Sequence, residues 1–371
     1  MPIRARSQLR TRYGIITNSE ADSSADTSFY KTVLSMFQEF EYRGHYNYFH
    51  DVPEIGDMAL ANWMTALGET GVSEEFIRVQ GARMRCVKTG NGPCLLLLHG
   101  LLGTADAWGA ATQRLAVDST VYAPDALGIG GSDRVPNLDA SLTATAGRLI
   151  ELMDAKGIDQ ADIVGTSHGG AVALMLAALH PERVRSLTLH APANPFSDLA
   201  DPLIRFYRTA LGRWFASRLP MVPANVQSLA LGRMYGDATR VHSASLERYI
   251  ASLRIPGTVA YVLSILDRWE LDMAALEAAL PSVRRVPALL LWGDRDRAVS
   301  LRSGERLVEY FDRATLVVIP GAGHLPHEEV PAAFAGAIAG FLGGLDRGKS
   351  HPKVNGLRIV TRNDVARNGA A

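Results

Sequence analysis

The sequence lacks features that would place it in several specialised classes of protein. It has only two cysteines, Cys86 and Cys94, too few for a disulfide framework or a zinc site. Neither sign of charge dominates, since 38 Lys+Arg balance 38 Asp+Glu among 371 residues. Nucleic-acid and anionic-membrane binders need surplus Lys and Arg, so no nucleic-acid partner is expected. The small number of cysteines favours a reducing compartment, and we expect a cytoplasmic protein.

Long apolar runs are also missing. Residues 330–345 carry no charge, yet they contain Pro331, and their bulky side chains recur at helical spacing. This pattern predicts an amphipathic helix packed on a core rather than a membrane span. Arginines are frequent near the N-terminus, but no apolar run follows them, as a secretory signal would require. We expect a disordered leader over residues 1–28; acidic residues within it disfavour a transit peptide.

The sequence instead shows strands alternating with helices from about residue 75. Before that point, Phe29, Val33 and Phe37 recur at helical spacing, which predicts an N-terminal helical extension over residues 29–74. The predicted strands are Phe76 to Val79, Met84 to Lys88, Cys94 to Leu98, Thr120 to Ala123, a strand beginning at Ile163, Val184 to Leu189, Ala288 to Trp292 and Thr315 to Ile319. Such alternation implies an α/β fold with a mostly parallel sheet covered on both faces.

The alternation stops between residues 194 and 283. This stretch contains helical segments without a clear strand, namely Leu203 to Leu219, Val226 to Tyr235 and Leu246 to Leu266. It is interpreted as a helical cap inserted over the strand ends, where open α/β sheets place their ligands. The α/β core is then expected over 75–193 and 284–345, with a flexible polar tail over 346–371.

The strongest chemical signal is Gly-Thr-Ser-His-Gly at residues 165–169. It follows a predicted strand and precedes an apolar helix, which is the context that gives G-x-S-x-G its meaning. The turn requires glycines because neighbouring side chains would collide with the strand or the helix. Ser167 is therefore predicted to be a nucleophile that projects above the sheet at a helix N-terminus.

A serine hydroxyl needs a base to become nucleophilic at neutral pH. His324 is the best candidate, because it follows a predicted strand on a loop with two glycines, at the same sheet edge as Ser167. His327, three residues later, is the alternative. The imidazole in turn needs an acid, and Asp296 follows the preceding strand. Asp294, which is expected to shape the turn, and Asp198 are weaker candidates.

The tetrahedral intermediate needs donors for its oxyanion. The loop after the strand 94–98 begins His99-Gly100, and the backbone N–H of Leu101 could act with that of His168 as the oxyanion hole. His99 itself is predicted to be a structural residue that bonds the loop backbone.

These motifs resemble those of the α/β-hydrolase fold superfamily over roughly residues 75–345. They occur in the same order: His99-Gly100, then D-A-L-G-I-G-G-S at 125–132, the Ser167 turn, and the loops of Asp296 and His324. The second matches the D-x-x-G-x-G-x-S turn of that family. The resemblance implies a Ser-Asp-His triad and a cap that shapes the substrate pocket.

The resemblance leaves several reactions open. Dehalogenases and epoxide hydrolases of this superfamily use an aspartate nucleophile, so a serine at position 167 disfavours both. We expect a serine hydrolase that cleaves a carboxylic ester, or a related acyl bond, through an acyl-enzyme. C–C hydrolases of ring-cleavage products, cofactor-free perhydrolases, thioesterases and acyltransferases are the alternatives. The C–C hydrolases usually continue the oxyanion loop as H-G-x-G-P-G, whereas residues 99–104 read His-Gly-Leu-Leu-Gly-Thr.

The predicted cap is rich in apolar and aromatic residues, which predicts a hydrophobic small-molecule substrate, with water as the second one. Arginines in the same stretch are interpreted as a solvated helix face rather than a site for an anion. No motif indicates a metal, nucleotide or flavin, so no cofactor is expected. Because serine, acid and histidine are all present, a non-enzymatic binding module is disfavoured.

Overall fold

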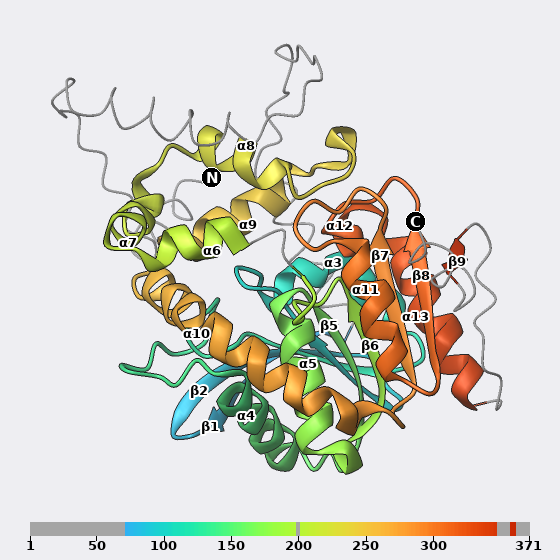
Figure 1. Ribbon diagram of the computed structural model, residues 1–371. Helices are drawn as coiled ribbons and strands as arrows, with labels where there is room; N and C mark the ends of the chain where they lie inside the picture. The colour runs from blue at the N-terminus through green and yellow to red at the C-terminus, as the bar shows by residue number, and fades with distance from the viewer. Residues whose placement is uncertain (1–70, 198–200, 347–356, 361–371) are drawn as a thin grey trace, which may run out of the picture. The chain divides into compact units, whose positions relative to one another are not determined.

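The structure is a computed structural model that describes residues 71–197, 201–346 and 357–360 (Figure 1). The chain divides into two units, Met1–Glu54 and Ile55–Ala371, and every described residue belongs to the second. The predicted leader over 1–28 and the predicted helices of 29–70 therefore lie outside the described residues.

A nine-stranded sheet runs through the described part of the chain, in the order β1-β2-β4-β3-β5-β6-β7-β8-β9. The strands from β4 to β8 in this order are parallel. Strands β1 and β2 extend one edge of the sheet and β9 extends the other, all in antiparallel pairing. The predicted α/β class with a mostly parallel sheet is confirmed. The strands are β1 (Ser73–Val79), β2 (Ala82–Thr89), β3 (Cys94–Leu98), β4 (Thr120–Pro124), β5 (Ala161–Thr166), β6 (Val184–His190), β7 (Ala288–Gly293), β8 (Ala314–Ile319) and β9 (Arg358–Val360).

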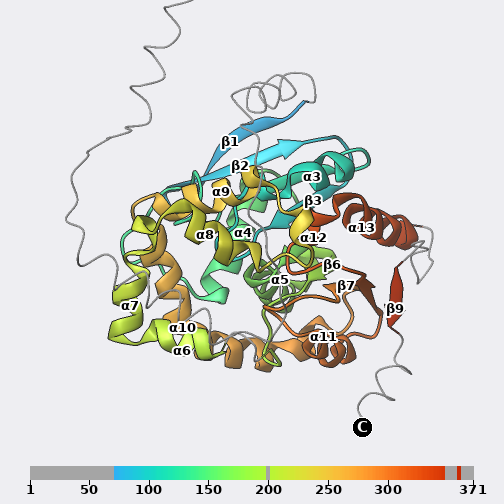
Figure 2. The ribbon, with the colours of Figure 1, turned by 90° about the horizontal axis from the view of Figure 1, so that it is seen from above.

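Helices cover both faces of this sheet, as Figure 2 shows from above. Each face has its own apolar core, because side chains of successive strand residues point in opposite directions. The helices of one face are α4 (Leu142–Ala155), α5 (His168–Leu179), the end of α10 (Thr258–Ala279) and α11 (Leu301–Leu307); those of the other face are α3 (Gly109–Leu115) and α13 (Pro331–Asp346).

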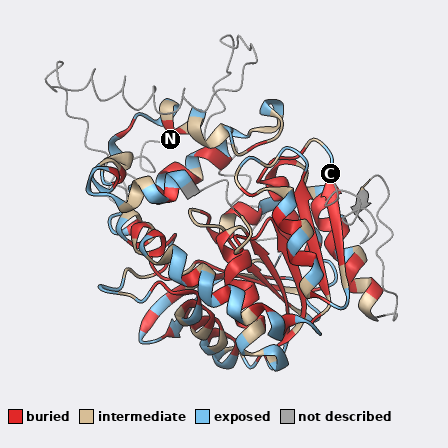
Figure 3. Ribbon diagram, in the orientation of Figure 1, coloured by how far each residue is buried: buried red, intermediate tan, exposed pale blue. Residues whose placement is uncertain are grey.

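Strand β3 illustrates why the central strands are continuous apolar runs. Leu96 and Leu98 enter the core beneath α4 and α5, whereas Leu95 and Leu97 enter the core beneath α3 and α13. All four leucines are buried, like the strands around them (Figure 3). Burying a leucine contributes about 1.5–3 kcal/mol, so a polar residue on either face would destabilise the sheet.

Between β6 and β7 the described residues form five α-helices, and two of the predicted helical stretches are wrong in detail. The stretch from Leu246 to Leu266 is two helices, because Pro256 has no N–H to donate and Gly257 adopts φ 93°. The stretch from Leu203 to Leu219 is divided at Thr209, whose hydroxyl accepts a hydrogen bond from the first turn of α7. These helices are α6 (Asp201–Arg208), α7 (Ala210–Ala216), α8 (Ala224–Gly232), α9 (Ser243–Arg254) and α10.

We call the helices between β6 and β7 the insertion, and its C-terminal end packs in the core of the sheet. Leu276, Leu280 and Val283 are fully buried with the sheet residues, although residue 283 is the predicted end of the cap. Helix α10 therefore starts in the insertion and ends against α5.

No single helix in the described ranges is long and apolar enough to cross a membrane; α9 and α10 meet that test only as a pair bent by 86°.

The two ends of the sheet depart from the predicted boundaries. Strand β1 begins at Ser73, inside the predicted N-terminal extension. The tail predicted to be flexible contributes β9, whose residues Arg358 to Val360 pair with Val318 to Leu316 of β8. An outer strand of a sheet presents unpaired N–H and C=O groups, and here a distant segment of the same chain pairs with them.

Candidate active site

Ser167 lies in the sharp turn between β5 and α5. Its backbone adopts φ 51° and ψ −120°, a conformation that costs a non-glycine residue about 1–3 kcal/mol. Helix α5 approaches the neighbouring strand β3 so closely that a Cβ atom on Gly169 would lie 2.3 Å from the carbonyl oxygen of Leu98. Only glycine fits there, as the motif predicted. The serine is thus held, strained, at the N-terminus of α5.

Hydrogen bonds to β6 hold this strained turn in place. The Ser167 N–H donates to the carbonyl oxygen of His190 over 3.0 Å, and the Ser167 carbonyl accepts from Ala193 N–H over 2.9 Å. The side chains of Thr166 and His190 also meet, with 2.7 Å between Oγ1 and Nδ1. The serine is therefore anchored to the neighbouring strand β6 through His190 and to the loop after it through Ala193.

Asp296 and His324 form the second part of the site, after β7 and β8. Nδ1 of His324 lies 2.7 Å from Oδ2 of Asp296, and the side chains are 3% and 1% exposed. The other carboxylate oxygen, Oδ1, accepts hydrogen bonds from the N–H groups of Ala298 (2.8 Å) and Val299 (3.0 Å). These bonds orient the carboxylate toward Nδ1, so the imidazole can use Nε2 as a base.

The sheet brings all three predicted residues to one edge, because β5, β6, β7 and β8 are successive neighbours and run parallel. His190, at the end of β6, connects them: its backbone holds Ser167, and its ring centroid is 5.9 Å from that of His324. A direct hydrogen bond joins Asp296 to His324. The hydroxyl of Ser167, in contrast, forms no hydrogen bond within the described residues.

The alternative residues are engaged elsewhere. Oδ1 of Asp294 accepts the N–H of Gly321 over 2.7 Å and so shapes the loop before His324. His327 is buried with its ring centroid 4.9 Å from that of Trp108, and burial lowers its pKa to about 4. Asp198 lies outside the described residues. Of the candidate pairs, the structure brings Asp296 and His324 together.

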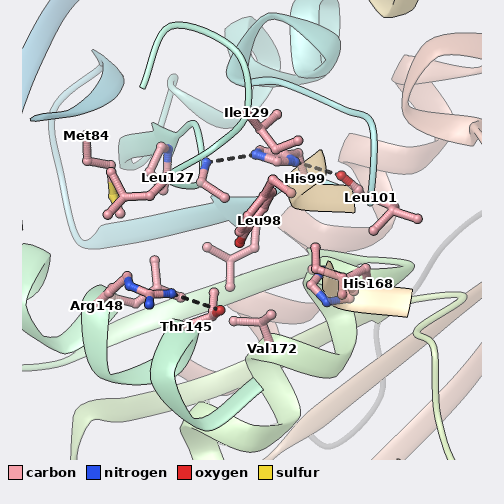
Figure 4. A pocket seen from close by; sticks show the side chains of 17 residues that line it. Met84, Leu98, His99, Leu101, Leu127, Ile129, Thr145, Arg148, His168 and Val172 are labelled. Atoms are coloured by element: carbon pink, nitrogen blue, oxygen red, sulfur yellow. Dashed lines mark hydrogen bonds between the residues drawn. The ribbon is translucent and has the colours of Figure 1, made fainter. Parts of the chain in front are cut away.

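The backbone N–H groups of Leu101 and His168, the predicted oxyanion hole, are without hydrogen-bond acceptors in the described structure. Both are therefore available to a ligand. Leu101 follows the end of β3, and His168 is the first residue of α5. Figure 4 shows both residues beside the same cavity.

His99 has the structural role predicted for it. Its Nε2 accepts the N–H of Ala126 over 3.0 Å, so Nδ1 carries the proton and donates to the carbonyl oxygen of Gly100 over 2.7 Å. Burial lowers the pKa of His99, which keeps the ring neutral in this arrangement. The ring thereby joins the loop after β3 to the loop after β4.

The loop after β4 is organised by a buried carboxylate. Asp125 accepts the N–H groups of Ala105 (2.6 Å) and Gly131 (2.7 Å), and it forms an ion pair with Arg85 over 3.1 Å. Arg85 also pairs with Asp106 over 3.0 Å. The sequence pattern did not indicate Arg85, because its partners are 21 and 40 residues away along the chain.

A small cavity of about 40 Å³ lies beside Leu101 and His168 (Figure 4). Most of its lining is apolar, with Arg148 and Thr145 at one end. Nε2 of His168 has no hydrogen-bond partner among the described residues, and burial lowers the pKa of this histidine to about 4. Within the described ranges, no group of three His, Cys, Asp or Glu side chains could hold a metal ion.

Residues 93–331 match the α/β-hydrolase fold family, and the chain belongs to this family. Among its relatives, 2-hydroxymuconate semialdehyde hydrolase of Pseudomonas sp. (strain CF600) is 31% identical, over 72% of this chain and 92% of the relative. Lipase 3 of Moraxella sp. (strain TA144) is 25% identical, over 69% of this chain and 79% of the relative. The crystal structure of Cfl2 from Burkholderia cenocepacia has a similar fold, with a TM-score of 0.65 at 22% identity over 73% of this chain and 96% of that one.

Proposed function

We propose that the protein is a serine hydrolase that cleaves a carboxylic ester, or a related acyl bond, of a hydrophobic small molecule. The observation that carries this proposal is the buried Asp296–His324 pair at the same sheet edge as the strained Ser167. A serine hydroxyl becomes an effective nucleophile when an oriented imidazole accepts its proton. Membership of the α/β-hydrolase family supports hydrolysis.

The proposed reaction begins when Oγ of Ser167 attacks the carbonyl carbon while Nε2 of His324 takes the hydroxyl proton. Asp296 stabilises the imidazolium that forms, and the imidazolium then protonates the leaving alcohol. The product of this half-reaction is an acyl-enzyme. Water attacks the acyl-enzyme with His324 as the base, the carboxylic acid leaves, and the serine regains its proton. We expect the hydrogen bond between Ser167 and His324 to form when substrate is bound, because catalytic hydrogen bonds often tighten only then.

The oxyanion of each tetrahedral intermediate accepts hydrogen bonds from the N–H groups of Leu101 and His168. One such donor is worth about 3 kcal/mol of transition-state stabilisation. The positive end of the α5 dipole, which begins at His168, adds to this stabilisation. The free N–H groups on both residues support this assignment.

The apolar lining of the cavity beside these donors supports a hydrophobic substrate. Leu98, Leu101, Ile129 and Val172 contribute to it, and Tyr261 of α10 lines it from the insertion. Helix α10 therefore acts, in this proposal, as the part of the cap that lines the pocket. The lining includes Leu101 and His168 but neither Ser167 nor His324, and a short apolar group of the substrate fits a cavity of this size and chemistry.

A second candidate is the hydrolysis of a carbon–carbon bond in a ring-cleavage product. The relative named 2-hydroxymuconate semialdehyde hydrolase, at 31% identity, favours it. The loop His-Gly-Leu-Leu-Gly-Thr at 99–104, which lacks the G-P-G sequence of such enzymes, favours the ester.

A fluorophosphonate probe and a substrate panel test the proposal. We expect the wild-type protein to be labelled and to hydrolyse p-nitrophenyl esters, and Ser167→Ala to lose both properties while keeping its circular dichroism spectrum. The panel contains esters, thioesters, lactones and vinylogous diketones. Preferential turnover of the diketones would establish the second candidate. Wild-type turnover by Ser167→Ala would exclude the serine as nucleophile.

A further inference from the structure

The loop that carries His324 is bonded to a short segment of the insertion, residues 234–236. The N–H of His324 donates to the carbonyl oxygen of Met234 over 2.7 Å. Glu329 lies between the two segments and is 7% exposed. Its Oε1 accepts the N–H of Gly323 over 2.8 Å, and its Oε2 accepts the N–H of Gly236 over 2.9 Å. One carboxylate therefore bridges the histidine loop and the insertion.

The two backbones touch at this point. A Cβ atom on Gly323 would lie 2.3 Å from the backbone nitrogen of Gly236 and 2.5 Å from the oxygen of Met234. Arg295, beside the catalytic acid candidate, extends the contact: its guanidinium donates to the carbonyl oxygen of Gly236 over 3.1 Å, and its N–H donates to that of Ala322 over 3.0 Å. The insertion is thus bonded to the loops of both the acid and the base.

A carboxylate suits this position for a chemical reason. Two N–H groups from different segments point at Glu329, and each bonds to a different carboxylate oxygen, so both oxygens of the side chain act as acceptors. An amide of the same shape would present an NH₂ group to one of these donors. Burial raises the pKa of Glu329, whereas the hydrogen bonds from the N–H groups oppose this shift.

We propose that Glu329 is a positioning residue for His324. Its carboxylate holds Gly323 against Gly236, and this contact sets the direction in which the adjacent imidazole reaches toward Ser167. The insertion is therefore part of the support of the catalytic base as well as a cover over the pocket. This inference rests on the proposed function, because it needs His324 to act as the base.

The neighbouring residue provides a matched control. Glu328 is also buried, and its carboxylate accepts hydrogen bonds from the hydroxyls of Tyr235 (3.1 Å) and Tyr249 (2.8 Å). It holds the same insertion through side chains and forms no hydrogen bond with residues 321–324 in the described structure. Replacing either glutamate by glutamine keeps the shape and removes one buried carboxylate.

The experiment compares Glu329→Gln with Glu328→Gln by ester hydrolysis, fluorophosphonate labelling and thermal melting. We expect Glu329→Gln to lower kcat and the labelling rate at least tenfold, with KM changed less than twofold. We expect Glu328→Gln to lower Tm by about as much as Glu329→Gln does, but to keep kcat within threefold of the wild-type value. Equal losses in the two variants, or wild-type kcat in Glu329→Gln, would overturn the proposal.

A variant on the exposed side of the contact keeps the test valid if Glu329→Gln does not fold. Arg295→Met removes the hydrogen bond to Gly236 and leaves the backbone N–H in place, and Arg295 is exposed. We expect it to lower kcat about threefold at unchanged Tm; an unchanged kcat counts against the proposal. Labelling of the wild type that disappears in Ser167→Ala tests the proposed function separately. An unlabelled wild type overturns the function and this inference together.

Discussion

The turn that carries Ser167 and the loop that carries His324 are supported in different ways. The serine turn lies between β5 and α5, and its tight approach at Gly169 and its bonds to β6 involve only the sheet and its own helix. The histidine loop receives much of its support from the insertion, through Met234, Gly236 and Glu329.

This difference suggests a division of roles in the proposed enzyme. Strain at the nucleophile needs rigid surroundings, and regular secondary structure provides them. In the proposed enzyme the base meets a substrate in a pocket that the insertion helps to line, so a loop bonded to that insertion couples the position of the base to this pocket. Changes that disturb the backbone of the serine turn should therefore reduce stability and activity together, whereas changes around the histidine loop should lower kcat by more than their loss of stability explains.

The largest expected effect concerns the acid. Asp296→Asn is expected to lower kcat for ester hydrolysis about 10⁴-fold, because an amide cannot stabilise the imidazolium or hold its tautomer. Asp294→Asn, which affects only the contact to Gly321, should cost less than tenfold. Steady-state kinetics on the two variants measure the difference. A larger loss in Asp294→Asn would assign the acid to that residue.

The serine turn is tested by a pair of glycines. Gly169→Ala places a Cβ atom 2.3 Å from the oxygen of Leu98, so we expect it to lower the free energy of unfolding by about 3 kcal/mol. Gly147→Ala, in α4, meets nothing within 4 Å and should raise that free energy by about 0.5–1 kcal/mol. Urea unfolding gives both values. Similar stability in the two variants would show that the turn can relax.

Acidification should weaken the packing behind the histidine loop. Burial lowers the pKa of His327 from 6.5 to about 4, so below pH 6.5 the unfolded chain binds a proton that the folded protein excludes. Stability from this residue is present above pH 6.5 and is lost as the pH falls, by about 2 kcal/mol between pH 7 and pH 5. His327→Phe should reduce that pH dependence in urea titrations; an unchanged slope would contradict the buried neutral ring.

The smallest effect is expected within the insertion, away from the histidine loop. Thr209 caps α7, since its hydroxyl accepts the N–H of Gly212 over 3.0 Å. Thr209→Ala should lower the free energy of unfolding by about 1 kcal/mol and leave kcat within twofold. Ser217→Ala, which removes a hydroxyl bonded to the oxygen of Trp214 at the other end of this helix, is the control and should cost less. A tenfold loss of kcat in Thr209→Ala would show that the whole insertion, not only residues 234–236, positions the base.

Much of the fold was predictable because its signals are local. The apolar runs of β3 and β7 and the glycines around Ser167 are patterns of adjacent residues. The sequence therefore indicates these elements directly, although it does not give the order of the strands in the sheet. The break at Pro256 and the edge strand Arg358–Val360 were missed. The first is a local signal hidden by apolar periodicity, whereas the second depends on pairing with β8.

By itself, the sequence determined the serine turn and the apolar strands, because glycine requirements and side-chain periodicity are properties of adjacent residues. Only the tertiary structure decided that Asp296, 28 residues from His324, faces its imidazole, and that Glu329 reaches across 93 residues to Gly236. Such contacts depend on how loops at the ends of parallel strands and the helices above them pack, and no short stretch of residues encodes that packing.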